Sequence, residues 1–286
     1  MSNIKIFADS TSDLPKAWVK QYDIGIIPLY VVFGSEQLRD GVDITPAELY
    51  ERVSQGGSLP KTAAPSPADF MAAFEPHVKR GDSILYVSLS SELSATYQNA
   101  LIAAGEYPGA SIRVVDSLNL SSAIGLLVMK AAHAAREGKS LDEILQLLEA
   151  IRPEVESEFV IDTLEYLYKG GRCSGVQNLL GSLLNIRPVI KVIDGKMTPA
   201  YKVRGKKEKA TNQMLQNAVD KSGLMDNDLI VVVHSFAEDE ALRLQKALQE
   251  NTNAREVALS TAGCVISSHC GPKTIGIMYS KKSIMT

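Results

Sequence analysis

Short apolar segments alternate with helical patterns along most of this chain of 286 residues. The segments Ile4–Ala8, Ser83–Ser88 and Ile112–Asp116 have the length and composition of buried strands. The second and third each precede a stretch whose apolar residues recur at helical spacing, at about residues 93–106 and 121–136. Such alternation is typical of α/β proteins, because a crossover helix returns the chain to a neighbouring parallel strand. We therefore expect an α/β fold with largely parallel sheets.

Local capping signals predict where three helices begin. The sequences Thr45-Pro-Ala-Glu48, Ser66-Pro-Ala-Asp69 and Ser140-Leu-Asp-Glu143 each place a hydroxyl residue three positions before a carboxylate. In such a capping box the two side chains bind backbone N–H groups that the first helical turn leaves free. These motifs predict helices that run to about Gln55, toward Lys79, and to a point before Pro153.

The pattern changes in the second half of the chain. Asp194-Gly195 separates two apolar segments, Val189–Ile193 and Met197–Val203, which is a strong signal of a β-hairpin. Around it we predict helices at 163–169, 174–184, from about 206 and at 238–250, and strands at 229–234 and 274–279. We place a domain boundary around residues 150–160 and predict two α/β domains, residues 1–155 and residues 156–286.

Composition limits the partners of such a chain. Its 30 Lys and Arg residues against 33 Asp and Glu residues give a formal net charge of −3, without the basic excess of a protein that coats nucleic acid. The longest uncharged run, Val257–Pro272, is too short to span a membrane. The first residues show no secretory h-region, and the three cysteines form no CxxC motif. We expect a cytoplasmic protein with reduced thiols, no nucleic-acid partner and no integral membrane segment.

Motifs for catalysis and cofactor binding are missing from the sequence. It holds neither the GxGxxG fingerprint of dinucleotide-binding proteins nor the GxSxG elbow of serine hydrolases. Gly138-Lys139-Ser140 lacks the first glycine of a phosphate-binding loop, and Ser58-Leu-Pro-Lys61 is placed in a loop by its proline. The four histidines show no paired ligand spacing. We accordingly assign no catalytic residue, no metal site and no cofactor.

Hydroxyl residues gather after the predicted strands of the first half. Asp9–Asp13, Ser90–Thr96 and Ser117 each follow a strand. In an open parallel sheet, ligands bind beyond the carboxyl ends of the strands, where helix N-termini with free N–H groups favour anions. One interpretation is a site that binds a carboxylate or a phosphate through several hydroxyls. The other is that each cluster caps a helix, since Ser and Thr are common N-caps.

Two basic segments and one histidine are notable in the second half. Gly170-Gly171-Arg172 allows close approach to a phosphate, and Tyr201–Lys209 is a basic segment in an acidic chain. A phosphate-bearing partner and an ordinary solvated helix face both account for such a run of charges. His269 lies in Ser267–Pro272, which we interpret as a Gly/Pro turn, with either a binding or a structural role for the histidine.

Together with several further segments, these motifs resemble the DegV family of bacterial fatty-acid-binding proteins. The matching segments follow one another along nearly the whole chain: Ala8–Leu14, Lys61–Pro67, Ser88–Tyr97, Lys169–Arg172, Leu180–Pro188, Lys202–Lys207 and His269–Pro272. The resemblance rests on this ordered set and on no single segment. The chain departs from the family pattern where Ala63-Ala64 replaces Ser-Gln, Ala95 replaces glycine and Cys270 replaces threonine.

The resemblance implies a function and a set of binding residues. It implies one long-chain fatty acid buried between the two domains, with its carboxylate held by Thr62 and Ser94 and with His269 as a third lipid-binding residue. It also implies that a separate fatty-acid kinase phosphorylates the bound acid to an acyl-phosphate for phospholipid synthesis. Arg172 and Arg204 match the family's arginines that serve the encounter with the kinase. The chain would then be a lipid-binding carrier and no enzyme by itself.

Two alternative functions remain open at this point. One is an enzyme, a small-anion phosphotransferase or hydrolase that uses the Ser90–Thr96 region and His269. The other is a regulatory sensor that binds a small anion and no lipid. The missing nucleotide loop, nucleophile elbow and paired catalytic carboxylates count against the enzyme.

Overall fold

The first half of the chain builds a four-stranded parallel sheet. The computed structural model describes residues 3–56, 58–173 and 186–283. The strand order is β2-β1-β6-β7, and every neighbouring pair is parallel. The strands are β1 (Ile4–Asp9), β2 (Gly25–Ile27), β6 (Ser83–Ser88) and β7 (Ile112–Asp116). The predicted α/β class and the predicted parallel sheet are confirmed here.

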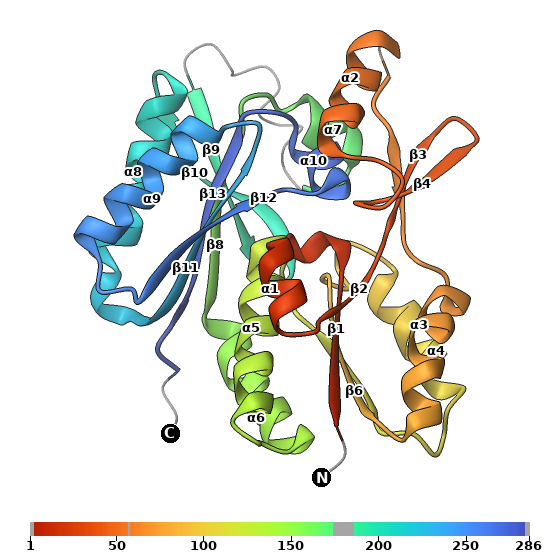
Figure 1. Cartoon of the computed structure of the whole chain (residues 1–286). Coiled ribbons are helices and arrows are strands. Elements are labelled where there is room, and N and C mark those ends of the chain that lie inside the picture. Colours follow the sequence, from red (N-terminus) through yellow and green to blue (C-terminus); the bar gives the residue numbers. More distant parts are fainter. Residues whose placement is uncertain (1–2, 57, 174–185, 284–286) are drawn as a thin grey trace.

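Side chains of this sheet alternate between two packed faces. Phe7 and Tyr86 belong to one cluster of buried side chains, whereas Ile6 and Leu85 belong to another. Because successive residues of a strand point to opposite faces, both faces need covering helices. Helices α3 and α4 cover the first face and α5 covers the second (Figure 1). The helices of this half are α1 (Lys16–Gln21), α2 (Pro46–Gly56), α3 (Pro67–Arg80), α4 (Thr96–Gly105), α5 (Ser122–Arg136) and α6 (Leu141–Ile151).

A small antiparallel sheet brings Thr62 next to the C-terminal part of the chain. Its order is β4-β3-β5, with strands β3 (Tyr30–Phe33), β4 (Glu36–Arg39) and β5 (Lys61–Ala63). Thr62 is the middle residue of β5 and pairs with Val31 of β3. Helix α10 (Cys264–Cys270) packs against β3, β5 and α2 (Figure 1). Residues that are far apart in the sequence therefore meet at this small sheet.

The second half forms a six-stranded sheet in the order β10-β9-β8-β13-β11-β12. Only β11 and β12 pair in parallel, and the other four neighbouring pairs are antiparallel. This sheet thus departs from the largely parallel arrangement that we expected. For β9 and β10 the reason is local, because the tight turn at Asp194-Gly195 can join only antiparallel strands. The strands are β8 (Val155–Val160), β9 (Ile186–Ile193), β10 (Lys196–Arg204), β11 (Met225–Ser235), β12 (Glu256–Thr261) and β13 (Thr274–Lys281).

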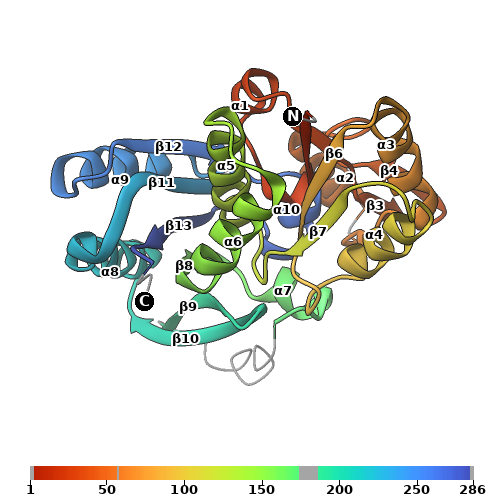
Figure 2. The same ribbon diagram turned by 90° about the horizontal axis from the view of Figure 1, so that it is seen from below.

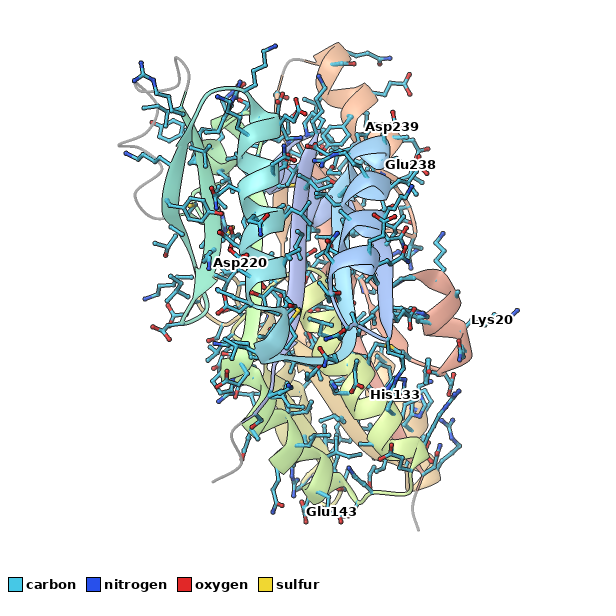
Figure 3. All side chains as sticks on the ribbon, turned by 90° about the vertical axis from the view of Figure 1, so that its left-hand side faces the viewer. Lys20, His133, Glu143, Asp220, Glu238 and Asp239 are labelled. Carbon is cyan, nitrogen blue, oxygen red and sulfur yellow. The ribbon has the colours of Figure 1, made fainter. Side chains whose placement is uncertain are left out.

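Helix α5 lies between the two large sheets (Figure 2). Val231 and Val233 of β11 belong to the same buried cluster as Ile124 of α5 and Ile6 of β1, so one core continues from sheet to sheet. The opposite face of the six-stranded sheet is covered by α8 (Lys207–Asp220) and α9 (Glu238–Asn251). Figure 3 shows these two helices from outside, with the exposed side chains of Asp220, Glu238 and Asp239. A further helix, α7 (Glu165–Gly170), packs against α10.

Most of the local predictions are confirmed. Capping boxes form at Thr45, Ser66 and Ser140, and β9 and β10 form the predicted hairpin. Strands β4, β5, β8 and β12 and helices α1 and α10 were not predicted, and the predicted helix at 174–184 lies outside the described residues. The division between residues 155 and 156 falls at the start of β8 and stays a prediction. No helix in the described part of the chain is long and apolar enough to cross a membrane.

Candidate functional site

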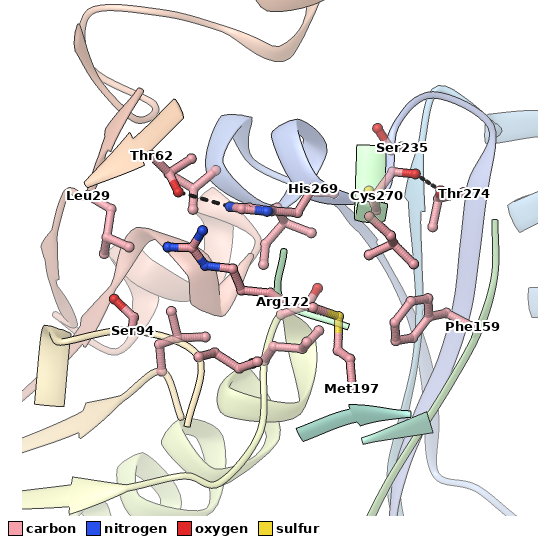
Figure 4. A pocket seen from close by; sticks show the side chains of 18 of the residues that line it. Leu29, Thr62, Ser94, Phe159, Arg172, Met197, Ser235, His269, Cys270 and Thr274 are labelled. Atoms are coloured by element: carbon pink, nitrogen blue, oxygen red, sulfur yellow. Dashed lines mark hydrogen bonds between the residues drawn. The ribbon is translucent and has the colours of Figure 1, made fainter. Parts of the chain in front are cut away.

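A cavity of about 220 Å³ is lined by residues from both halves of the chain. Its wall is mainly apolar and includes Leu29, Leu89, Leu93, Leu120, Phe159, Leu167, Met197, Val233, Val265, Ile266 and Met278. Among the described residues that line it, none is Lys, Asp or Glu. Figure 4 shows Thr62 and Ser94 on one side of this cavity, and Phe159 and Met197 on the other. Apolar walls with a few placed polar groups are typical of sites for small organic ligands.

Thr62 and His269 meet at the polar side of the cavity. The Oγ1 atom of Thr62 lies 2.9 Å from Nε2 of His269 (Figure 4). Thr62 is positioned by its pairing in β5, and His269 by the last turn of α10. Our interpretation of Ser267–Pro272 as a turn is therefore wrong for His269, which lies in a helix that ends at Cys270. That helix holds the imidazole against β5.

The other imidazole nitrogen of His269 faces the backbone of α7. Its Nδ1 atom is buried and has no hydrogen-bond partner among the described residues. A Cβ atom on Gly170 would collide with this Nδ1, so the imidazole needs a glycine there. A buried N–H without an acceptor is rarer than a buried acceptor without a donor, so the proton belongs on Nε2. In that tautomer His269 donates to Thr62, and the hydroxyl hydrogen of Thr62 is free for a ligand.

His269 is uncharged at neutral pH. Burial, with a smaller effect of the nearby Arg172 guanidinium, lowers the pKa of His269 to about 4. A charged imidazolium is disfavoured here because the site removes it from water and supplies no carboxylate to pair with it. The histidine therefore acts as a hydrogen-bond donor and adds no positive charge to the cavity.

Ser94 lies beside the N-terminus of α4. Its Oγ atom is 2.8 Å from Oγ1 of Thr96 and accepts a hydrogen bond from the backbone N–H of Thr96 at 3.3 Å. The N-cap residue of α4 is Ala95, whose side chain cannot bind the free N–H groups of the first turn. An anion next to Ser94 would meet a hydroxyl and the positive end of a helix dipole.

The two arginines that the sequence singled out lie in different places. Arg172 lines the cavity, extends past His269 in Figure 4, and donates from Nη1 to the carbonyl of Gly170 at 2.7 Å. Arg204 is exposed at the end of β10 and is not among the lining residues. The structure thus brings Thr62, Ser94, His269 and Arg172 to one cavity and leaves Arg204 on the surface.

The remaining hydroxyl clusters have structural partners. The Oγ1 atom of Thr11 and the Oγ atom of Ser12 donate to Asp9, Ser10 accepts from the backbone of Leu29, and Ser117 donates to the carbonyl of Asn119. These hydroxyls bond within the protein and do not line the cavity. Of the three clusters that follow strands, only Ser90–Thr96 contributes a hydroxyl to the cavity, that of Ser94.

Several lining residues escaped the sequence analysis. Ser121, Ser235 and Thr274 supply further hydroxyls, and α10 supplies much of one wall. In the sequence, the continuous apolar run Leu229–Val233 is a signal for a buried strand, but it does not separate a cavity wall from ordinary core. Among the described residues, no group of three or more His, Cys, Asp or Glu side chains is placed to hold a metal ion.

Comparison with known sequences identifies the family. The sequence model of the DegV family, described as uncharacterised protein, matches residues 3–282. The chain belongs to the DegV family. A DegV domain-containing protein of Caldanaerobacter subterraneus subsp. tengcongensis is 34% identical over 282 residues, which cover 99% of this chain and 100% of that relative. A DegV domain-containing protein of Clostridium perfringens is 34% identical to this chain, and the match covers 98% of each of the two chains.

Solved DegV structures share the fold over its full extent. A fatty-acid-binding DegV-family protein of Thermus thermophilus is 34% identical, with a TM-score of 0.91 and coverage of 97% of this chain and 99% of that one. A stearic-acid-binding protein of Eubacterium ventriosum is 27% identical, with a TM-score of 0.90 and coverage of 100% of both chains. The DegV fold of this chain therefore has the architecture of proteins that bind fatty acids.

Proposed function

We propose that this DegV chain binds one long-chain fatty acid in the cavity, with the carboxylate between Thr62 and Ser94. The observation that carries the proposal is the composition of the cavity wall: an apolar lining that has Thr62, Ser94 and His269 at one side. The fatty-acid and stearic-acid binding of its structural relatives supports the same ligand class.

The apolar wall supplies the main favourable term for such a ligand. Burial of an acyl chain contributes about 0.8 kcal/mol per methylene, so a long tail yields on the order of 10 kcal/mol before the costs of association. Phe159, Met197 and Met278 offer the tail flexible or flat apolar surfaces.

The polar side offsets the cost of removing a carboxylate from water. Thr62 and Ser94 can each donate a hydroxyl hydrogen, and the first turn of α4 adds its backbone dipoles. Arg172 adds a positive charge at the cavity wall. A carboxylate that is held by hydroxyl hydrogen bonds and by one arginine at the cavity wall keeps its oxygens available for phosphorylation by another protein.

We further propose that the chain presents the bound acid to a separate fatty-acid kinase, which forms an acyl-phosphate for phospholipid synthesis in the cytoplasm. The basic segment at the end of β10 supports this encounter. Lys202, Arg204, Lys206 and Lys209 are exposed and form no ion pair among the described residues, in contrast to Lys207, which pairs with Glu240 at 2.7 Å. Unpaired cations on a surface attract an acidic or phosphate-bearing partner.

The geometry disfavours the alternative of a phosphotransferase or hydrolase that uses Ser90–Thr96 and His269. The Oγ atom of Ser94 bonds to Thr96, and His269 bonds to Thr62. A general base needs a pKa near the working pH, and burial lowers that of His269 to about 4. Its Nδ1 also has no carboxylate to orient it.

Native mass spectrometry with organic extraction tests lipid binding. We expect a mass excess that corresponds to one long-chain fatty acid, either after purification or after addition of the acid. Ser94→Ala is expected to weaken binding about tenfold, because a buried carboxylate loses a hydroxyl donor. Ser91→Ala is the matched control, since Ser91 is exposed and does not line the cavity. A protein that stays empty in the presence of fatty acid would contradict the proposal. Equal affinities of the two variants for the fatty acid would show that its carboxylate does not bind at Ser94.

Arginine variants test the kinase step. Arg204→Ala is expected to leave fatty-acid affinity unchanged and to slow kinase-dependent formation of acyl-phosphate, because Arg204 is exposed outside the cavity. Arg172→Ala is expected to reduce both, since Arg172 lines the cavity. Lys246→Ala, on the exposed side of α9, serves as the control. If the kinase forms acyl-phosphate at the normal rate with Arg204→Ala, the proposed contact between the basic segment and the kinase is contradicted.

A further inference from the structure

Two buried carboxylates hold the N-terminus of α10. The Oδ1 atom of Asp13 accepts a hydrogen bond from the backbone N–H of Gly263 at 2.8 Å. Asp40 accepts from the backbone N–H of Cys264 at 2.7 Å and from that of Val265 at 3.2 Å. The first three N–H groups at this end of the helix are thus bound by side chains that lie far away in the sequence. The bonds tie α10 to the first half of the chain.

The surroundings of these carboxylates show that the helix end is their main partner. Asp13 and Asp40 are 6% and 3% exposed, and no Lys or Arg side chain pairs with either of them among the described residues. Burial raises the pKa of both carboxyls, and for Asp13 the neighbouring charges of Asp40 and Asp9 act in the same direction. Backbone N–H groups and the helix dipole compensate the charges in place of a cation.

Gly263 leaves room for both carboxylates at the helix end. A Cβ atom at this position would stand 3.2 Å from an oxygen of Asp13 and 3.2 Å from an oxygen of Asp40. Two further side-chain contacts lie next to these carboxylates. Ser121 donates to the second oxygen of Asp13, and the thiol of Cys264 contacts the carbonyl of Ile44 at 3.3 Å.

The helix that these carboxylates hold carries one wall of the cavity. Val265, Ile266, His269 and Cys270 of α10 line the cavity, whereas Asp13 and Asp40 do not. His269 is separated from the bound N–H groups by little more than one helical turn. A rotation or fraying of α10 would therefore move the imidazole away from Thr62.

We propose that Asp13 and Asp40 are positioning residues of the fatty-acid site, which hold α10 so that His269 keeps its hydrogen bond to Thr62. This inference rests on the function proposed above. Loss of the carboxylate at residue 40 leaves two helix N–H groups without an acceptor and lets water reach α10. The imidazole then becomes exposed, Thr62 loses its partner, and the carboxylate of a fatty acid is held less well.

The test compares Asp40→Ala and Asp40→Asn with the control Asp43→Asn. Asp43 is on the same loop but pairs with Arg39 at 2.8 Å at the surface. His269 is first titrated by NMR in the lipid-free full-length protein. We expect its titration to move from about pH 4 toward the ordinary value of about 6.5 in Asp40→Ala, and less far in Asp40→Asn, which keeps one acceptor oxygen. Asp43→Asn is expected to titrate like the wild type.

Fatty-acid affinity is the second measurement. We expect a loss of about tenfold in Asp40→Ala, a smaller loss in Asp40→Asn and none in Asp43→Asn. If His269 titrates near pH 4 in all variants and their affinities match the wild type, the positioning role is overturned. Where far-UV circular dichroism shows that Asp40→Ala does not fold, Asp40→Asn decides by the same criteria.

Ser94→Ala, measured in the same assay, separates this inference from the proposed function. Weakened binding in Ser94→Ala with unchanged behaviour of both Asp40 variants overturns the positioning role alone. A protein that binds no fatty acid in any form overturns the proposed function, and the His269 titration then decides by itself whether Asp40 positions the imidazole.

Discussion

His269 shows how strongly the chemistry of one residue depends on its surroundings. Histidine is ordinarily read as a base or a metal ligand, because its unperturbed pKa lies near neutrality. Here burial lowers that pKa to about 4, Nε2 contacts Thr62, and Nδ1 lies unpaired against Gly170. The residue is thereby converted into a neutral donor that orients a threonine hydroxyl.

The lowered pKa of His269 predicts a pH dependence of stability. Between about pH 6.5 and pH 4 the unfolded chain binds a proton that the folded chain does not bind. The free energy of unfolding therefore falls as the pH is lowered through this window, by up to roughly 3 kcal/mol from this residue, and falls no further below it.

Chemical denaturation across that pH range measures the effect. The wild type is compared with His269→Gln, which keeps an N–H donor and cannot titrate. Contributions from Asp13, Asp40 and His234, whose pKa values are also shifted, are common to both proteins and cancel in the difference. A difference that is constant between pH 4 and 6.5 would contradict the buried neutral imidazole.

Among the elements, α10 is the one on which the candidate site depends most. It is seven residues long, has no side-chain cap of its own, and contacts α7, α2, β3 and β5. A helix this short is marginal in isolation, so its stability comes from tertiary contacts. Asp13 and Asp40 bind its N-terminal end, and Gly170 of α7 lets His269 near its other end pack closely against α7.

The close contact between α7 and α10 predicts the effect of a methyl group. Gly170→Ala is expected to lower the free energy of unfolding by about 1–3 kcal/mol and to weaken fatty-acid binding, because the new Cβ displaces His269. Gly105→Ala, at the end of α4, is the control, since a Cβ there meets nothing within 4 Å. It is expected to be neutral or to stabilise the protein by up to about 1 kcal/mol. Equal behaviour of the two variants in denaturation and binding assays would contradict the close contact.

For the whole molecule, the shared core joins the two large sheets. One buried cluster contains Ile6 of β1, Ile124 of α5 and Met278 of β13, and the partly buried Trp18 packs against it. The side chains of α5 thus contribute to the packing of both sheets, and α10 adds a second connection. The predicted domains 1–155 and 156–286 are therefore joined by shared buried side chains as well as by the chain connection between them.

This arrangement predicts a single cooperative unfolding transition. Trp18 is the sole tryptophan and lies in α1, so its fluorescence reports on the first half, whereas far-UV circular dichroism reports on all helices. We expect the two signals to give the same midpoint in denaturant, because the shared core couples the halves. If Trp18 unfolds at a clearly different denaturant concentration, the halves are independent folding units.

Local sequence signals were sufficient for much of the fold. The capping boxes at Thr45, Ser66 and Ser140 and the turn at Asp194-Gly195 act over three or four residues, so they are readable without the rest of the chain. Strand β8 was missed because charged and apolar residues mix in Val155–Val160, and it is stabilised by β13 and β9.

The sequence by itself determined the α/β class and most helix starts, and through the family resemblance it led to the proposal of Thr62, Ser94 and His269 as binding residues. Tertiary structure alone decided that His269 lies in a helix, that Arg172 joins the cavity while Arg204 does not, and that Asp13 and Asp40 hold α10. The physical reason is the range of the interactions. A cap or a turn is made within one segment, whereas burial, a pKa and a cavity wall arise only where distant segments pack together.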